Sequence, residues 1–425
     1  MLLGVLLLFV DFLPFLVVFA IIWLVFIIRW PILGLISYVL VILLRPGEVL
    51  GIPFVAKAVA GACIFAWLVR YVLPQKPMRV TAAYKAMLFF VASVGFSAVS
   101  AFWIQQVFDT WQDSLKLLVL YTITISFVDT SQKLAIFGTA VLAAVGYTGA
   151  YVIYNIAVIT GYSGQRIHEL AWGMFSDSNE FSQIIVMLLP ILVLLLIEIK
   201  GLKWRLFSCL MIAIGMVIMV LSASRGGFLG LLIICVALWL RGRRKMLLLI
   251  VVAASMGALL LLAPSSLFER LGSITQYSQD ESSLGRLEAW SAGLRMFLRN
   301  PVSGIGAGCF DYASLDYGLS KELVAHNSFI TVVAETGLIG LISYLCLIYY
   351  TFQGCRRIRS ALLLQGRQGG LIYVLSEALP ISLIGFIATS MFISTTYYPQ
   401  LFILCATVTA ADNIIAHSEE ATGLQ

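Results

Sequence analysis

Apolar segments long enough to cross a bilayer recur along almost the whole chain, and they restrict the fold more than any other feature. A membrane-crossing helix needs about 17–25 mostly apolar residues. The sequence predicts about thirteen spans, at 2–28, 31–44, 53–73, 85–103, 111–128, 134–159, 179–198, 204–221, 226–240, 246–263, 327–352, 371–392 and 397–415. The first is interrupted by Asp11 and Pro14 and the second is short, so we expect twelve to fourteen transmembrane helices. A backbone in lipid must satisfy its own hydrogen bonds, which predicts an all-α polytopic membrane protein with one membrane-embedded domain over residues 1–425.

The amount and placement of charge exclude a soluble protein and a nucleic-acid-binding protein. Charged residues make up 11% of the chain and hydrophobic residues 61%, whereas soluble domains carry about 25% charged residues. The net charge of +6 comes largely from short basic clusters between spans, around residues 70–79, 200–205, 241–245 and 356–367. The positive-inside rule places such clusters in the cytoplasm, so we interpret them as topology signals of a multi-pass membrane protein.

The longest polar stretch, residues 264–325, then lies outside the cytoplasm, together with loop 161–178 and the turn at 222–225. Within it, "SSLGRLEAWSAGLRMFLRNP" predicts an amphipathic helix that ends at Asn300-Pro301. Leu287, Trp290, Leu294 and Leu298 fall on one face. We expect this helix to lie along the membrane surface or to pack across the ends of the spans.

Arg225 is the first candidate for chemistry, in "LSASRGGFLGLL" between two apolar runs. One interpretation is snorkelling to the lipid headgroups. The other is an anion site, favoured by Gly226 and Gly227, which let other groups approach, and by Ser222 and Ser224. If a helix begins here, its unpaired N–H groups favour phosphate.

His326 is the second candidate, where the long loop meets the span that follows. An imidazole there can exchange protons near neutral pH, or His326 and Asn327 can simply cap the helix, and the residues alone favour neither. Glu335 lies nine residues further on, about 180° around the helix, so it is expected to be a carboxylate paired elsewhere.

The stretch "GYSGQRIHELAWGMFSDSNEFSQ" gathers Arg166, His168, Asp177 and Glu180. Two carboxylates without a third ligand are weak evidence for a metal, and a helix start capped by Ser178 or Asn179 is the favoured interpretation. "NPVSGIGAGCF" predicts tight turns, because no strand precedes its glycines as in a dinucleotide-binding fingerprint. The seven cysteines form no CxxC motif, which predicts neither a zinc site nor a disulfide framework.

The order of three motifs resembles the O-antigen ligase family, which includes glycan polymerases and bacterial O-oligosaccharyltransferases. The motifs are "SASRGG", "GRLEAWSAGLRMFLRNPVSGIGAGCF" and "AHNSFITVVAETGLIGLISYL", with "GMFSDSNEFSQIIVMLLP" upstream, and the resemblance covers about residues 170–350. It implies a multi-pass enzyme of the bacterial inner membrane whose active site faces the periplasm. Such an enzyme takes a glycan from a polyprenyl diphosphate, such as undecaprenyl diphosphate, and joins it to an acceptor hydroxyl.

The family's functional residues fall on Arg225, Arg286 and His326, which we expect to be catalytic. Arg225 and Arg286 are also expected to bind substrate, together with Arg166, Glu180 and Asn327. Guanidinium forks bind diphosphate bidentately and stabilise the charge that builds on it as it leaves, while a neutral histidine can take the acceptor's proton. The expected reaction therefore inverts the sugar carbon and needs neither a metal nor a cofactor.

The acceptor remains open at this stage. Lipid A core is the first expectation, and a growing glycan or a protein hydroxyl is the alternative. No large soluble acceptor-binding domain is evident, which favours a lipid or glycan acceptor. A transporter or flippase of lipid-linked glycans would use Arg225 as a counter-charge, but no internal repeat typical of transporters is evident. A non-catalytic scaffold would leave Arg225, Arg286 and His326 unexplained.

Overall fold

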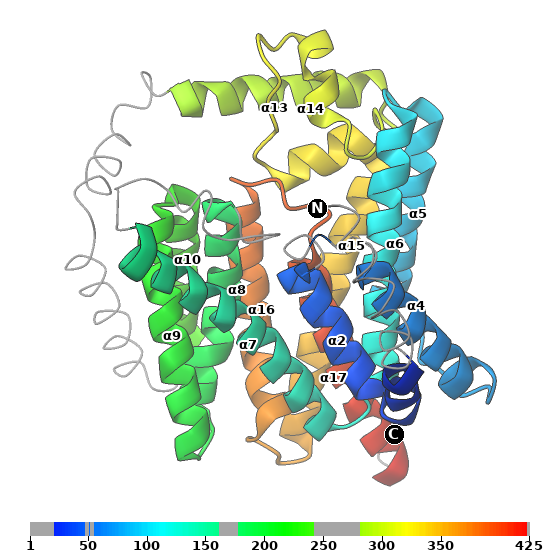
Figure 1. Ribbon diagram of the computed structural model, residues 1–425, viewed down its shortest axis with the longest axis vertical. Coiled ribbons are helices and arrows are strands. Elements are labelled where there is room, and N and C mark those ends of the chain that lie inside the picture. The colour runs from blue at the N-terminus through cyan, green and yellow to red at the C-terminus, as the bar shows by residue number, and fades with distance from the viewer. Residues whose placement is uncertain (1–20, 47–50, 52–54, 161–176, 242–280, 423–425) are drawn as a thin grey trace, which may run out of the picture.

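The computed structural model describes residues 21–46, 51, 55–160, 177–241 and 281–422, and every regular element within them is a helix (Figure 1). Eight helices in these ranges are long and apolar enough to cross a membrane. The bent pair Ile21–Arg29 and Pro31–Leu44 (α2) would make a ninth. The all-α polytopic prediction is therefore confirmed. The eight spans are Val55–Val72 (α4, η1), Ala82–Ser100 (α5, η2), Ser131–Val158 (α7 with part of η3), Ser178–Glu198 (α8), Leu202–Ser222 (α9), Ser328–Leu364 (α15), Leu371–Ser390 (α16) and Pro399–Glu420 (in α17).

Two further helices coincide with predicted spans but differ from the eight in length or polarity. α6 (Ile104–Phe127) carries Asp109, Asp113 and Lys116 in its first half, and α10 (Arg225–Arg241) has only 17 residues. Two of the thirteen predicted segments lie outside the described residues, segment 2–28 for the most part and segment 246–263 completely. The total of twelve to fourteen spans thus stays a prediction.

The helices pack around aromatic side chains where α5, α15 and α17 meet. The ring of Phe90 lies 5.3 Å from that of Tyr344 and 5.9 Å from that of Phe402, and all three side chains are almost fully buried. Buried aromatic rings in such offset pairs contribute about 0.5–1.5 kcal/mol beyond the area they bury. This contact joins the middle of the chain to its C-terminal helix.

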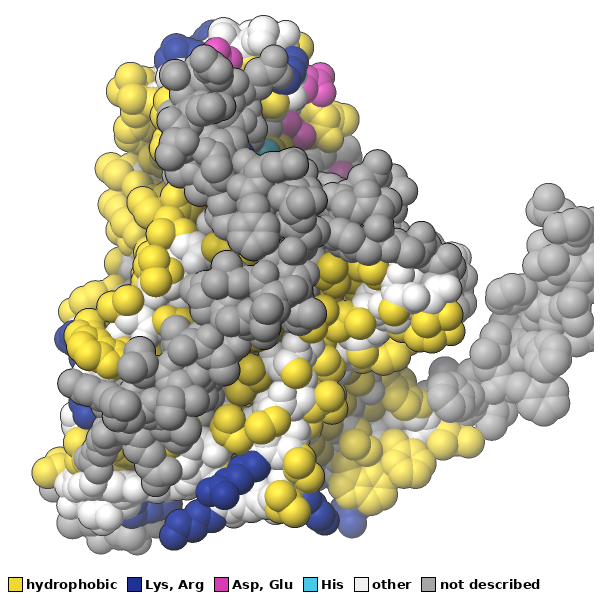
Figure 2. Space-filling model, turned by 90° about the vertical axis from the view of Figure 1, so that its left-hand side faces the viewer, with side chains coloured by type: hydrophobic (Ala, Val, Ile, Leu, Met, Phe, Trp, Pro, Cys, Tyr) yellow, Lys and Arg dark blue, Asp and Glu magenta, His cyan; other side chains and the backbone are white. Residues whose placement is uncertain are grey.

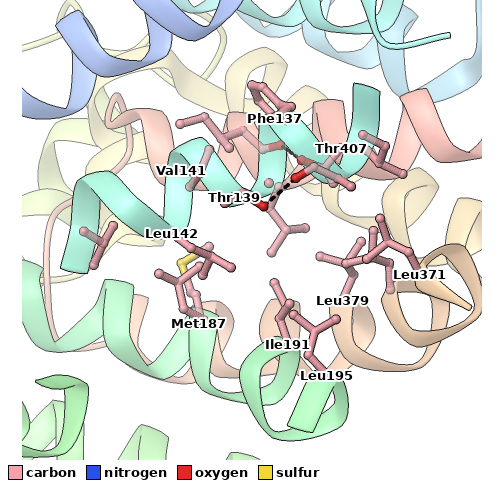
Figure 3. Close-up of a pocket in the computed structure, with 18 of the residues that line it drawn as sticks. Phe137, Thr139, Val141, Leu142, Met187, Ile191, Leu195, Leu371, Leu379 and Thr407 are labelled. Atoms are coloured by element: carbon pink, nitrogen blue, oxygen red, sulfur yellow. Dashed lines mark hydrogen bonds between the residues drawn. The ribbon is translucent and has the colours of Figure 1, made fainter. Parts of the chain in front are cut away.

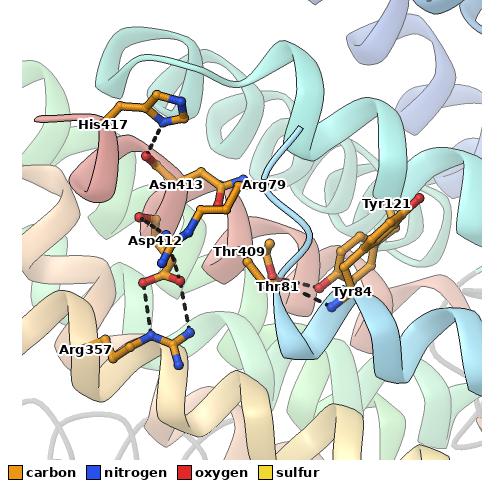
Figure 4. A network of polar contacts seen from close by, with 9 residues as sticks. All are labelled: Arg79, Thr81, Tyr84, Tyr121, Arg357, Thr409, Asp412, Asn413 and His417. Atoms are coloured by element: carbon orange, nitrogen blue, oxygen red, sulfur yellow. Dashed lines mark hydrogen bonds and ion pairs between the residues drawn. The ribbon is translucent and has the colours of Figure 1, made fainter. Parts of the chain in front are cut away.

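One end of the bundle, which we call the basic end, carries the connection between α8 and α9, the end of α15 and the start of α5. There the buried carboxylate of Asp412 in α17 lies 3.0 Å from Arg357 and 3.5 Å from Arg79 (Figure 4). Lysine and arginine side chains are visible at this end in the space-filling view (Figure 2). A buried carboxylate left without its partner costs about 3–5 kcal/mol, so these two pairs hold α15, α17 and the approach to α5 together.

The opposite end is covered by α13 (Glu281–Arg299), which lies across the bundle (Figure 1). The predicted amphipathic helix and its end before Asn300-Pro301 are confirmed. The predicted apolar face is not the one that packs. Small side chains and Met296 are buried, whereas Leu287, Leu294 and Leu298 are 45%, 52% and 66% exposed. Small residues let α13 approach α15 closely, and a row of leucines would hold it further away.

Candidate functional site

Arg225 is the first residue of α10, and a fixed turn places it there. Ala223 ends α9 in the left-handed region (φ 46°), and the Ser224 hydroxyl accepts a hydrogen bond of 3.1 Å from the backbone N–H of Gly227. The same hydroxyl donates to Asn179 at the start of α8, at 2.8 Å. The turn that carries Arg225 is thus capped locally and tied to a second helix N-terminus.

The glycines after Arg225 are required by packing. A Cβ on Gly227 would lie 2.5 Å from the Ser182 hydroxyl, and one on Gly226 would lie 3.0 Å from Phe392. A Cβ on Gly230 would meet Thr389 at 2.4 Å. The predicted close approach is confirmed, and the groups that approach are α8, α16 and the segment after α16.

Arg225 and Arg286, which are far apart in the sequence, line the same small polar pocket. Arg286 comes from α13, across the end of the bundle, and both side chains are partly buried. Thr389, Phe392 and Ile393, at the end of α16 and in the loop that follows it, also line the pocket, and no sequence pattern indicated them. The other lining residues are Asn179, Ser224, Gly226 and Gly227.

Three helix N-termini meet around this pocket. α8 is capped by Asp177, which accepts hydrogen bonds from Asn179 and Glu180, and α10 is capped by Ser224. α15 is capped by Asn327, and its first residue, Ser328, donates to Ile393 of the pocket wall at 2.7 Å. The N-termini of α10 and α15 each carry about half a positive charge, which adds to the two guanidinium groups, whereas the Asp177 carboxylate offsets the positive end of α8. The arrangement favours an anion.

His326 lies immediately before this cap of α15, in the left-handed region (φ 46°). It is not among the residues that line the arginine pocket, but α13 fixes its neighbour. The indole N–H of Trp290, one helical turn from Arg286, donates to the carbonyl of Ala325 at 2.9 Å. α13 therefore positions both Arg286 and the segment that carries His326.

Asn327 acts as the helix cap that the sequence offered as one alternative. Its Oδ1 accepts from the N–H groups of Phe329 and Ile330 at 3.0 and 3.2 Å, and the residue is buried. Because the oxygen is used by the cap, only the amide nitrogen of Asn327 is left to contact a substrate.

The loop after α16 is bound tightly to α15 and α8. Thr395 donates its N–H to Ser328 at 2.9 Å, and Ser394 pairs with Thr331 at 3.0 Å. Below the pocket, Gln183 donates to Thr389 and Ser390 and accepts from Thr395 and Gln400, all at 2.9–3.0 Å. These five buried side chains, which we call the Gln183 layer, close the pocket toward the membrane interior. Within the layer, only the side-chain oxygen of Gln400 is buried without a partner among the described residues, and the shared hydrogen bonds of Gln183 favour one arrangement of the layer.

Glu335 in α15 binds the backbone of the glycine-rich loop at residues 301–310. The buried Glu335 carboxylate accepts hydrogen bonds from the N–H groups of Gly308 and Phe310 at 2.9 and 3.1 Å and from the hydroxyl of Tyr397 at 2.7 Å. The expected pairing elsewhere is confirmed. α15 is broken at Gly337 (φ 63°), and Leu338 donates to the carbonyl of Pro301 at 2.8 Å. The loop fills this break, so the tight turns predicted there are also confirmed.

The remaining predicted residues lie elsewhere or outside the described part. Glu180 is in the first turn of α8, where its side chain bonds to Tyr398. Burial, and then the charge of Glu180, raise the pKa of the Tyr398 hydroxyl above its ordinary value, so this hydroxyl stays protonated and donates. The predicted caps Ser178 and Asn179 were wrong, because Asp177 is the cap. Arg166 and His168 lie outside the described residues. Within the described ranges, no three potential metal-ligating side chains come together.

The fold and the pocket define a polytopic all-α membrane protein with a cationic site at one end of its helix bundle. Residues 207–345, about a third of the chain, match the family model described as O-Antigen ligase, and this match supports the resemblance to that family. The matched segment contains Arg225, Arg286 and His326. No curated protein matches the chain. At a general level, the match supports an enzyme that transfers lipid-linked glycans.

Proposed function

We propose that the protein transfers a glycan from a polyprenyl diphosphate, such as undecaprenyl diphosphate, to an acceptor hydroxyl at the periplasmic face of the inner membrane. The observation that carries the proposal is the shared pocket of Arg225 and Arg286, where three helix N-termini meet. Diphosphate is the part of the substrate that this chemistry recognises, because guanidinium groups and N-terminal N–H groups both favour phosphate oxygens.

In the proposed reaction, the acceptor oxygen attacks the anomeric carbon and the bond from that carbon to the diphosphate oxygen breaks. The electron pair leaves with the diphosphate, where Arg225 and Arg286 stabilise the growing negative charge. His326 takes the proton of the acceptor hydroxyl. A single displacement inverts the anomeric carbon. The two guanidinium groups supply the positive charge that a divalent ion would otherwise provide, so the reaction is proposed to be metal-independent.

Lipid A core is the proposed acceptor, and a growing glycan or a protein hydroxyl would make the protein a polymerase or an O-oligosaccharyltransferase of the same family. A flippase of lipid-linked glycans is disfavoured by the Gln183 layer. A transported headgroup needs a polar path through the bundle, and this layer of buried side chains lies directly below the arginine pocket.

The orientation follows from the positive-inside rule, which assigns the basic end to the cytoplasm and the arginine pocket to the periplasm. In intact cells, an impermeant thiol reagent should label Leu298→Cys on α13 and should label Arg367→Cys only after lysis. Labelling of Arg367→Cys in intact cells would reverse the orientation.

The activity is tested with purified protein in lipid nanodiscs, a polyprenyl-diphosphate glycan, candidate acceptors and a chelator. Arg286→Ala should abolish most of the transfer. Arg299→Ala, a matched change on the exposed face of the same helix, should leave transfer near the wild-type rate. Equal losses in the two variants would remove the arginine pocket from the reaction. Activity that disappears with chelator and returns with a divalent ion would refute metal independence.

A further inference from the structure

A second cavity lies in the half of the bundle toward the basic end, between α7 and the pair α16 and α17 (Figure 3). Its volume of about 400 Å³ falls in the range of small-molecule sites, about 300–1,000 Å³. The part of α8 that lines it, from Ile184 to Leu195, extends for about 17 Å at 1.5 Å per residue. One leaflet has about 15 Å of hydrocarbon, half of the usual core thickness. The cavity is therefore about as long as one acyl chain.

The middle of the cavity presents hydrocarbon only. Its walls are leucine, isoleucine, valine and methionine side chains, and the hydroxyls of Thr139 and Thr407 donate to carbonyls of their own helices at 2.7 Å. A Cβ on Gly138 would meet no atom within 4 Å, which shows open space beside the helix. At its inner end the cavity reaches Gln400 of the Gln183 layer, which separates it from the arginine pocket.

The other end of the cavity is polar and basic. Ser131, Gln132 and Trp204 line it there. Trp204 stands between Lys203 and Arg205 in the first turn of α9, and Lys200 precedes them. All three basic residues are exposed, and no ion pair joins any of them to another described residue.

The start of α9 is an unusual place for these cations. Gly201 gives the helix no side-chain cap, and positive side chains are disfavoured beside the positive end of a helix dipole. An anion bound here would accept hydrogen bonds from the unpaired N–H groups and balance the three cations. Tryptophan is enriched at this depth, where hydrocarbon meets headgroups.

We propose that the cavity binds an anionic phospholipid, with one acyl chain between α7, α8, α16 and α17 and the phosphate at the start of α9. The charge of the entrance selects a negative headgroup, and the apolar walls select the chain. This site is separate from the glycan-transfer site and does not rest on the proposed function.

The test uses delipidated full-length protein in detergent and measures lipid binding by native mass spectrometry and thermal stabilisation. The probes are phosphatidylglycerol, phosphatidylcholine with the same chains, and undecaprenyl phosphate. Wild-type protein should retain phosphatidylglycerol at least tenfold more tightly than phosphatidylcholine. Lys203→Gln with Arg205→Gln should remove that preference, whereas Lys85→Gln with Arg356→Gln, two exposed basic residues also at the basic end, should keep it.

Gly138→Phe should fill the cavity and reduce phosphatidylglycerol binding at least tenfold. Gly61→Phe is the matched control, because a Cβ there also meets nothing within 4 Å but the residue lies outside the cavity. If Gly138→Phe fails to fold, Gly138→Leu makes the same test with a smaller side chain. Three results would overturn the proposal. One is unchanged phosphatidylglycerol binding in the filled variant, and another is equal binding of the two phospholipids to wild-type protein. The third is binding of undecaprenyl phosphate that phosphatidylglycerol cannot displace.

Discussion

Replacement of Glu335 tests whether this carboxylate holds the loop in the break of α15 or takes part in proton transfer. In Glu335→Ala, three buried donors lose their acceptor: the N–H groups of Gly308 and Phe310 and the hydroxyl of Tyr397. Each unsatisfied buried donor costs about 1–3 kcal/mol, so the total is roughly 3–9 kcal/mol. Since the net stability of a folded protein is about 5–15 kcal/mol, little folded Glu335→Ala protein should accumulate.

Glu335→Gln separates the two roles. The glutamine oxygen can keep the two donors that share one carboxylate oxygen, Gly308 and Tyr397, while its NH₂ group faces the N–H of Phe310. One hydrogen bond is lost, at about 1–3 kcal/mol, which lowers Tm by about 1–3 °C for a chain of this length. Thermal unfolding of the purified protein measures this shift, and Glu288→Gln on the exposed face of α13 should show none. Transfer by Glu335→Gln below its Tm should stay near the wild-type rate. A variant with unchanged Tm and no transfer would refute the structural role and make Glu335 a proton carrier.

Three further outcomes are expected. Arg225→Ala should weaken carrier binding and lower the transfer rate. Arg225→Lys should restore both only in part, because a point charge cannot replace the bidentate fork. Full rescue by lysine in a binding titration would contradict this geometry. His326→Ala should leave carrier binding nearly intact and slow single-turnover transfer by roughly 10²-fold or more. The wild-type rate should fall at acidic pH, because a protonated imidazole cannot accept the acceptor's proton. Loss of binding with a normal rate at saturating carrier would show that His326 is a ligand or a cap. Trp290→Phe removes the hydrogen bond to Ala325, worth about 1 kcal/mol. The kcat should therefore fall about fivefold, with the KM for the carrier unchanged. A rise in KM alone would argue against a role of Trp290 in positioning His326.

The fold was predictable from the sequence because apolar length alone decides which segments enter the membrane. The segments 179–198 and 371–392 differ from α8 and α16 by no more than two residues at either end. The packing face of α13 was not predictable in the same way. Its leucines dominate the apolar pattern, yet the close approach to α15 selects Ala289, Ala292 and Met296.

The candidate site was predictable only in part. Arg225 stands out as a charge beside apolar runs, but its partnership with Arg286 came from the family resemblance, because no local pattern links two residues on different helices. The polar run "STTYYP" near residue 394 was the available signal for the loop after α16. Its role at the pocket depends on contacts with Ser328 and Gln183, which lie more than 60 residues away in the chain.

The Gln183 layer has a consequence for the membrane as a barrier. A cationic pocket open to water on one side of an energised membrane is a potential leak for protons. The five side chains below it are amides and hydroxyls, which do not titrate, and all are buried. Their side-chain hydrogen bonds run to one another, to adjacent backbone and to the Ser328 hydroxyl, and beyond Gln400 lies the apolar cavity. The layer therefore contains no acid or base that could take up a proton from the pocket, and most of the side chains that line the cavity behind it are hydrocarbon.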